Sequence, residues 1–89
     1  MVINFKYENA KGEIKLREVL VVHQNKDYIQ GFDLKYLNDS ERKNVVNNFG
    51  SKEITDVKFG GVIDYNKIGV SKETFCKSYR CFKTKSIYN

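Results

Sequence analysis

Apolar and polar residues alternate with a period of two at the start of the chain, which is typical of a half-buried β-strand. In residues 2–7, the apolar side of this alternation is formed by Ile3, Phe5 and Tyr7. The polar residues that follow include Gly12, which can adopt the positive φ of a tight turn. We therefore predict a first strand that leads through a turn into a second strand.

The second and third apolar runs extend this hairpin. Residues 13–22 alternate as well, but the apolar parity shifts by one residue near Arg17 and Glu18, which predicts a bulge or a sharp bend there. Residues 28–34 form a third run, in which Gly31 marks a bend or a close backbone approach. We predict a three-stranded antiparallel meander that curls as in a small barrel.

A helix interrupts the strands in the middle of the chain. Asn38 stands three residues before Glu41, which is the spacing of a capping box, and Gly50 is suited to end a helix. Three apolar residues follow the capping box at helical intervals: Val45, Val46 and Phe49. We predict a short helix over residues 39–49.

The remainder of the chain returns to strand-like runs. Residues 53–59 and 62–68 flank two consecutive glycines, a pair that favours a hairpin. Residues 71–76 fit either a helical turn or a loop, and residues 77–87 are predicted as one final strand. Together these elements predict a mainly β protein of the α+β class, with a small, strongly bent antiparallel sheet or barrel and one short inserted helix.

The net charge of +5 is concentrated at the C-terminus. Residues 71–89 hold five basic residues against the single acidic residue Glu73, whereas residues 1–51 are close to neutral. A local positive potential of this kind attracts phosphates. A charged, solvated surface without a ligand is the other interpretation that this distribution allows.

The C-terminal segment interleaves its cations with aromatic residues. Single-stranded nucleic acid binds where rings stack on bases and cations neutralise phosphates, so a strand with both residue types is a candidate site. We predict a nucleic-acid or phosphate site that includes Lys77, Tyr79, Arg80, Lys83 and Lys85. The alternative is that Tyr79 and Phe82 belong to the core and that the lysines form a solvated rim.

Three stretches of the chain follow patterns of a known domain family. They are residues 3–7 with Gly12 and Arg17, residues 27–32, and residues 80–83 with residues 86–87. These stretches resemble the WYL domain, a small Sm-like β-barrel at the C-termini of bacterial transcription regulators and in some defence-associated proteins. The chain departs from the family at Asp27, where the family has Trp, and at Ser86, where it has Arg.

The resemblance implies a single WYL-like β-barrel domain over residues 1–89, in which the helix and hairpin at about 38–70 form an insertion. It also implies that Arg17 and Arg80 line the ligand surface and that Tyr28 can donate a hydrogen bond to a ligand. Arginine can hold a phosphate with two parallel hydrogen bonds.

Ordinary structural roles are also open to two of these residues. Arg17 could pair at the surface with Glu18 or Asp33, and Tyr28 could fill the barrel wall.

The sequence gives little support for catalysis, metal binding or membrane insertion. His23 stands in a predicted turn without a nucleophile at a known spacing, so we expect no enzyme activity and no cofactor. Cys76 and Cys81 are too few for a disulfide scaffold or a zinc site, and we expect two half-buried thiols. No apolar run is long enough to cross a membrane and no secretory signal is visible, so a cytoplasmic location is expected.

Two functions from different classes remain open at this point. The first is a regulatory module that binds single-stranded nucleic acid or a phosphorylated ligand through the basic and aromatic C-terminal strand. The second is a stand-alone protein-interaction module or inhibitor, of viral or mobile-element origin, that acts on a host protein. An unpaired edge strand could also join two copies into a homodimer.

Overall fold

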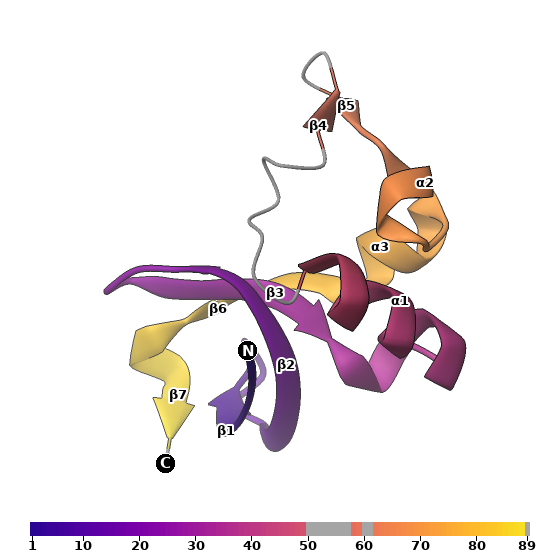
Figure 1. Ribbon diagram of the computed structural model, residues 1–89. Helices are drawn as coiled ribbons and strands as arrows, with labels where there is room; N and C mark the ends of the chain where they lie inside the picture. The colour runs from indigo at the N-terminus through magenta and orange to yellow at the C-terminus, as the bar shows by residue number, and fades with distance from the viewer. Residues whose placement is uncertain (50–57, 60–61, 89) are drawn as a thin grey trace.

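Five antiparallel strands form one strongly bent sheet that is not closed (Figure 1). The structure is a computed structural model of the chain, and it describes residues 1–49, 58–59 and 62–88. The strand order in the sheet is β6–β3–β2–β1–β7, which confirms the predicted meander. The strands are β1 (Val2–Glu8), β2 (Ile14–Gln24), β3 (Tyr28–Asp33), β6 (Tyr79–Lys83) and β7 (Ile87–Tyr88).

Of the bulge or sharp bend that we expected near Arg17 and Glu18, the bulge is absent. The pairing of β1 with β2 runs without a break through both residues, and the register shift lies instead between Val21 and His23, where β2 pairs with β3. The alternation of apolar and polar residues shifts by one position because both faces of β2 are buried in its second half. Val19 and Leu20 are neighbours in sequence, and their side chains lie in two different cores.

The predicted helix is confirmed as α1 (Asp39–Phe49). The capping box forms at its start, because Asn38 N donates to Glu41 Oε1 at 2.9 Å and Glu41 N donates to Asn38 Oδ1 at 2.8 Å. Val45 and Phe49 are buried, whereas Val46 is 42% exposed. The apolar stripe of α1 is therefore narrower than the sequence indicated, and Gly50 lies outside the described residues.

Two further helices occupy segments where the sequence predicts a strand or fits either a helical turn or a loop. In the predicted run 62–68, only β5 (Val62–Ile63) is a strand, and it pairs with β4 (Lys58–Phe59). Asp64 accepts a hydrogen bond from Asn66 N at 3.1 Å and starts α2 (Tyr65–Ile68), which overrides the strand prediction there. Residues 53–57 and the two glycines between β4 and β5 lie outside the described residues.

The tail is not one strand, which corrects the prediction for residues 77–87. It begins as α3 (Lys72–Ser78), continues as β6, and then turns through a 3₁₀ helix (Thr84–Ser86) into β7. Ser71 caps α3 through a hydrogen bond from Thr74 N to its hydroxyl oxygen. The 3₁₀ turn carries the chain from one edge of the sheet to the other, where β7 pairs with β1 (Figure 1).

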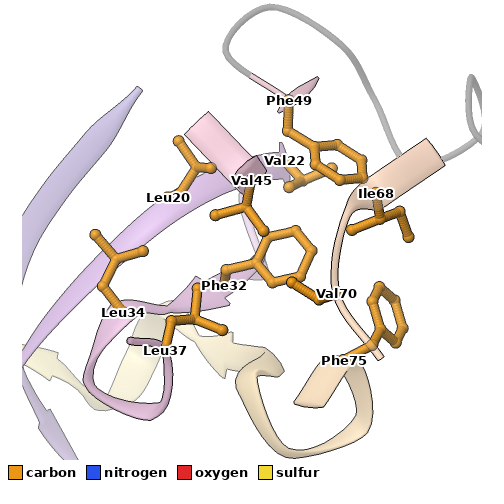
Figure 2. Close-up of a cluster of buried hydrophobic side chains, with 10 residues drawn as sticks. All are labelled: Leu20, Val22, Phe32, Leu34, Leu37, Val45, Phe49, Ile68, Val70 and Phe75. Atoms are coloured by element: carbon orange, nitrogen blue, oxygen red, sulfur yellow. The ribbon is translucent and has the colours of Figure 1, made fainter. Parts of the chain in front are cut away.

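The larger core lies between the sheet and the helices. Figure 2 shows Phe32 of β3 in the middle of this cluster, with Val45 and Phe49 of α1 on one side and Phe75 of α3 on another. The rings of Phe32 and Phe49 are 5.2 Å apart between centroids, and those of Phe32 and Phe75 are 5.7 Å apart. The buried members of the cluster are Leu20, Val22, Phe32, Leu34, Leu37, Val45, Phe49, Ile68, Val70 and Phe75.

A second, smaller core fills the opposite, concave side of the sheet. Phe5, Val19 and Phe82 are buried there, and Tyr7 packs edge-on against Phe82 with 5.0 Å between ring centroids. Lys83 N also donates to the Tyr7 hydroxyl oxygen at 3.4 Å. Tyr7 therefore links β1 to the edge strand β6, although the backbone of the sheet does not close into a barrel.

The outer edge of β6 has few free donors. The backbone N–H of Thr84 donates to Asp27 O at 3.0 Å, so the backbone N–H groups of alternate residues in the tail point toward β3. The backbone N–H groups of the other residues, Tyr79, Cys81 and Lys83, point away from the sheet. Tyr79 N already donates to Phe75 O, and Lys83 N donates to Tyr7. Dimerisation through this edge stays a prediction, and it would depend mainly on Cys81.

Gly31 permits the close approach of β2 and β3, as its position in the sequence indicated. A Cβ atom at residue 31 would overlap the carbonyl oxygen of Leu20 and lie 3.0 Å from Val21 Cα. Both contacts are with backbone, which cannot rotate away as a side chain can.

Replacing Gly31 with Ala should therefore lower the free energy of unfolding by about 3 kcal/mol, because the sheet must open to admit the methyl group. Gly12→Ala is the matched control: a Cβ there meets nothing within 4 Å, and only the positive φ of 82° adds strain of about 1 kcal/mol. Urea unfolding of the two variants measures the difference. Equal losses would show that the close approach is not a constraint.

Candidate functional site

Four of the predicted cations lie exposed along β6 and its two ends. Lys77 is in the last turn of α3, Arg80 and Lys83 are on β6, and Lys85 is in the 3₁₀ helix that follows. None of the four takes part in an ion pair with a described residue. The C-terminal charge is therefore held at one edge of the sheet by three different elements.

A hollow of about 360 Å³ lies beside the C-terminal end of β6, and we call it the Tyr28 hollow. Tyr28 is half-buried and pairs across the sheet with Lys83, so ring and ammonium group come from neighbouring strands. The hydroxyl of Thr84 donates to Lys26 O at 2.7 Å and holds the turn against the start of β3. The hollow is lined by Asp27, Tyr28, Cys81, Lys83, Thr84 and Lys85.

A second hollow, of about 530 Å³, lies beside the N-terminal end of β6, and we call it the Tyr36 hollow. Tyr36 ends a 3₁₀ helix (Leu34–Tyr36) that follows β3, and the guanidinium carbon of Arg80 lies 5.6 Å from the centre of its ring. The hollow is lined by Tyr36, Cys76, Lys77, Tyr79, Arg80 and Cys81. Because Cys81 lines both hollows, they are neighbours along β6.

The lysine pair of the Tyr28 hollow also borders a third hollow of about 200 Å³. Its lining includes Tyr7 and Glu8 of β1 together with Lys83 and Lys85. Glu8 accepts a hydrogen bond from the Tyr88 hydroxyl at 2.8 Å. The two lysines therefore also border a hollow toward the edge formed by β7, where Glu8 adds an acidic group.

Tyr79 belongs to the core, as one of the two interpretations of the tail anticipated. Its ring stacks on Phe75, with 5.0 Å between centroids and 9° between planes, and its hydroxyl group is buried without a hydrogen-bond partner among the described residues. Burial raises the pKa of the Tyr79 phenol to about 12, and its neighbours Cys81 and Tyr28 add to the rise. Phe82 is only 1% exposed, so its ring is not available to stack on a ligand, whereas Tyr79 is half-buried and one face of its ring is covered by Phe75.

Arg17 does not join the other predicted site residues. It is 8% exposed, and its Nη1 donates to Asp33 Oδ2 at 3.2 Å. Asp33 also accepts from Lys35 N and is itself completely buried. The pairing of Arg17 with Asp33 is thus present, but inside the protein rather than at the surface, and it holds β2 against the end of β3.

The two cysteines are exposed free thiols, which corrects the expectation that they are half-buried. Cys76 on α3 and Cys81 on β6 both border the Tyr36 hollow.

In the part of the chain that the structure describes, no group of three or more His, Cys, Asp or Glu side chains could hold a metal ion. The same residues include no helix long and apolar enough to span a membrane.

Tyr36 is the member of the site that the sequence did not reveal. It stands just after the third apolar run, and it meets Arg80 only because β3 pairs with β6.

No protein family, characterised protein or solved structure matches this chain. The resemblance to WYL domains therefore stays a prediction.

The raised pKa of Tyr79 predicts a loss of stability in alkali. Between the ordinary pKa of 10.0 and about 12, the phenol ionises in the unfolded chain but stays protonated in the folded one, so stability falls as the pH rises. Tyr79→Phe should lose less stability than the wild type between pH 7 and pH 11, as measured by urea unfolding. At pH 7 the variant should be at least as stable, because the removed hydroxyl has no partner. Identical pH profiles would contradict this account.

Proposed function

We propose that this protein is a small binding module for single-stranded nucleic acid, of regulatory type and without catalytic activity. One observation carries the proposal: each of two neighbouring hollows along β6 combines a half-buried tyrosine with two exposed cations. The Tyr28 hollow has Lys83 and Lys85, and the Tyr36 hollow has Lys77 and Arg80. Unpaired nucleotides present the same two features, a flat base and a phosphate, at regular intervals.

The mechanism is stacking of bases on rings combined with neutralisation of phosphates. A single strand lying along β6 would place one base against Tyr28 and another against the Tyr36–Arg80 pair, with phosphates beside the cations between them. A duplex keeps its bases stacked on one another, so the hollows favour unpaired strands. A nucleic-acid role agrees with what the resemblance to WYL domains implies, and we place it in the cytoplasm, where free thiols such as those of Cys76 and Cys81 stay reduced.

Charge reversal at the site should abolish most of the affinity. Four cations can neutralise at most four phosphates, so the affinity should fall with salt with a logarithmic slope no steeper than about −2.8. In Arg80→Glu/Lys83→Glu, one cation is lost from each hollow, and the affinity for a labelled single-stranded oligonucleotide should fall by about tenfold or more, with a slope shallower by about 1.4. Fluorescence anisotropy at several salt concentrations measures both quantities.

The matched control is Lys43→Glu/Lys67→Glu, which changes the net charge equally at exposed positions on α1 and α2, outside the hollows along β6. This control should retain nearly all of the affinity. The proposal fails if both double variants lose affinity equally, or if the wild type binds no oligonucleotide.

A protein-interaction module is the second candidate function, and an exposed apolar patch favours it. Ile14 and Leu16 of β2 are 54% and 70% exposed, on the same face of the strand as the buried Leu20. The helices cover that face only around Leu20, so the hairpin end stays open to solvent. Apolar side chains grouped at the surface are typical of contact sites between proteins.

Leu16→Ser discriminates between the two candidates. If a protein partner binds this patch, a complex purified with it should survive nuclease treatment and be lost in Leu16→Ser. If nucleic acid is the ligand of β6, oligonucleotide affinity should be unchanged in this variant. Loss of oligonucleotide binding in Leu16→Ser would contradict the assignment of the nucleic-acid site to β6.

A further inference from the structure

One carboxylate stands in the otherwise basic Tyr28 hollow. Asp27 is exposed and lines this hollow together with Lys83 and Lys85. Its side chain forms no ion pair within 4.0 Å and no hydrogen bond with any described residue. The two lysines nearby therefore leave its oxygen atoms available to a ligand.

The backbone of Asp27 is held by two hydrogen bonds, so the point from which its side chain extends into the hollow is defined. Its N–H donates to Asn25 Oδ1 at 2.8 Å, and its carbonyl oxygen accepts from Thr84 N at 3.0 Å. Tyr28, the next residue, is held by a hydrogen bond from its own N–H to the same Asn25 oxygen at 3.0 Å. A base that stacks on Tyr28 would thus share the hollow with this carboxylate.

Guanine is the base whose edge suits a carboxylate best. Its N1–H and N2–H₂ groups are adjacent donors, and together they match the two oxygens of one carboxylate. Adenine and cytosine each present one amino group beside an acceptor nitrogen, and the acceptor would face the negative charge. Uracil presents one N–H between two carbonyl oxygens.

We propose that the Tyr28 hollow is a guanine-selective subsite in which Asp27 accepts hydrogen bonds from N1–H and N2–H₂. This inference rests on the proposed function, since it names the base that one of its two subsites takes. Lys83 and Lys85 hold the flanking phosphates, and the Tyr28 ring supports the plane of the base. The Tyr36 hollow has no carboxylate among its lining residues, so it accepts any base.

The test compares labelled RNA hexamers of uridine that carry one guanosine, adenosine or inosine at the third position. By fluorescence anisotropy, the wild-type protein should bind the guanosine hexamer about tenfold more tightly than the adenosine hexamer, which is the discrimination of one bidentate contact. Inosine lacks the N2 amino group and should bind with intermediate affinity.

Asp27→Asn should reduce the preference for guanosine over adenosine to about twofold, because an amide offers only one acceptor oxygen. Its affinity for the adenosine hexamer should rise slightly, since a negative charge is removed from a phosphate site, whereas its affinity for the guanosine hexamer should fall with the lost acceptor. Glu8→Gln is the matched control: it removes the same charge beside Lys83 and Lys85 but outside the Tyr28 hollow, so the preference should stay near tenfold.

The outcomes separate this inference from the function on which it rests. Equal affinity of the wild type for all three hexamers would overturn guanine selectivity and leave single-strand binding intact. A guanosine preference that persists in Asp27→Asn would overturn the role of Asp27. If no hexamer binds, both the subsite and the proposed function are wrong.

Discussion

The close approach of β2 and β3 at Gly31 is the constraint on which the rest of the structure depends. The carbonyl group of Leu20 occupies the space that a side chain at residue 31 would need. The register of the two strands shifts directly beyond this point, between Val21 and His23. Because consecutive residues of a strand point to opposite faces, β2 contributes Val19 to one core and Leu20 to the other, so a small sheet is buried on both sides without closing into a barrel.

The packing of the helices on the sheet also determines which part of β6 stays open to solvent. Phe32 and Tyr79 face each other across β3 and β6, and the helices cover them. At the other end of the same strand pair, Tyr28 and Lys83 face each other beside an open hollow. The cations have no described acidic partner there, and basic side chains on an edge strand also discourage pairing with a foreign sheet. The basic side chains along β6 thus protect this edge of the sheet from pairing and also bring positive charge together beside the hollow.

Local signals predicted most of the elements, because their physical causes are local. The alternation in residues 2–7 and the capping box of Asn38 and Glu41 depend on neighbours in sequence, and the structure confirms both. The bulge in β2 was misplaced because the sequence does not reveal that a strand is buried on both faces. The tail is divided between helix and strand because Ser71 caps α3. In the sequence, this N-cap signal competes with the alternation of basic and aromatic residues that begins at Lys77, which favours a strand.

The placement of the candidate site residues could be predicted only in part, for a related reason. A run of cations at the C-terminus was visible in the sequence, and Lys77, Arg80, Lys83 and Lys85 do lie together. The role of each ring was not visible, because it depends on which face of the sheet the helices cover. Tyr79 stacks inside on Phe75, and Tyr36 takes its place beside Arg80 through a pairing of strands far apart in the chain.

The most direct test of the central claim is a map of amide chemical shifts in the ¹⁵N-labelled protein as a single-stranded hexanucleotide is added. If the ligand lies along β6, the largest changes will be at Tyr28, Tyr36, Cys81 and Lys83, with none around Leu16. Changes confined to the hairpin of β1 and β2, or no changes at all, would contradict it.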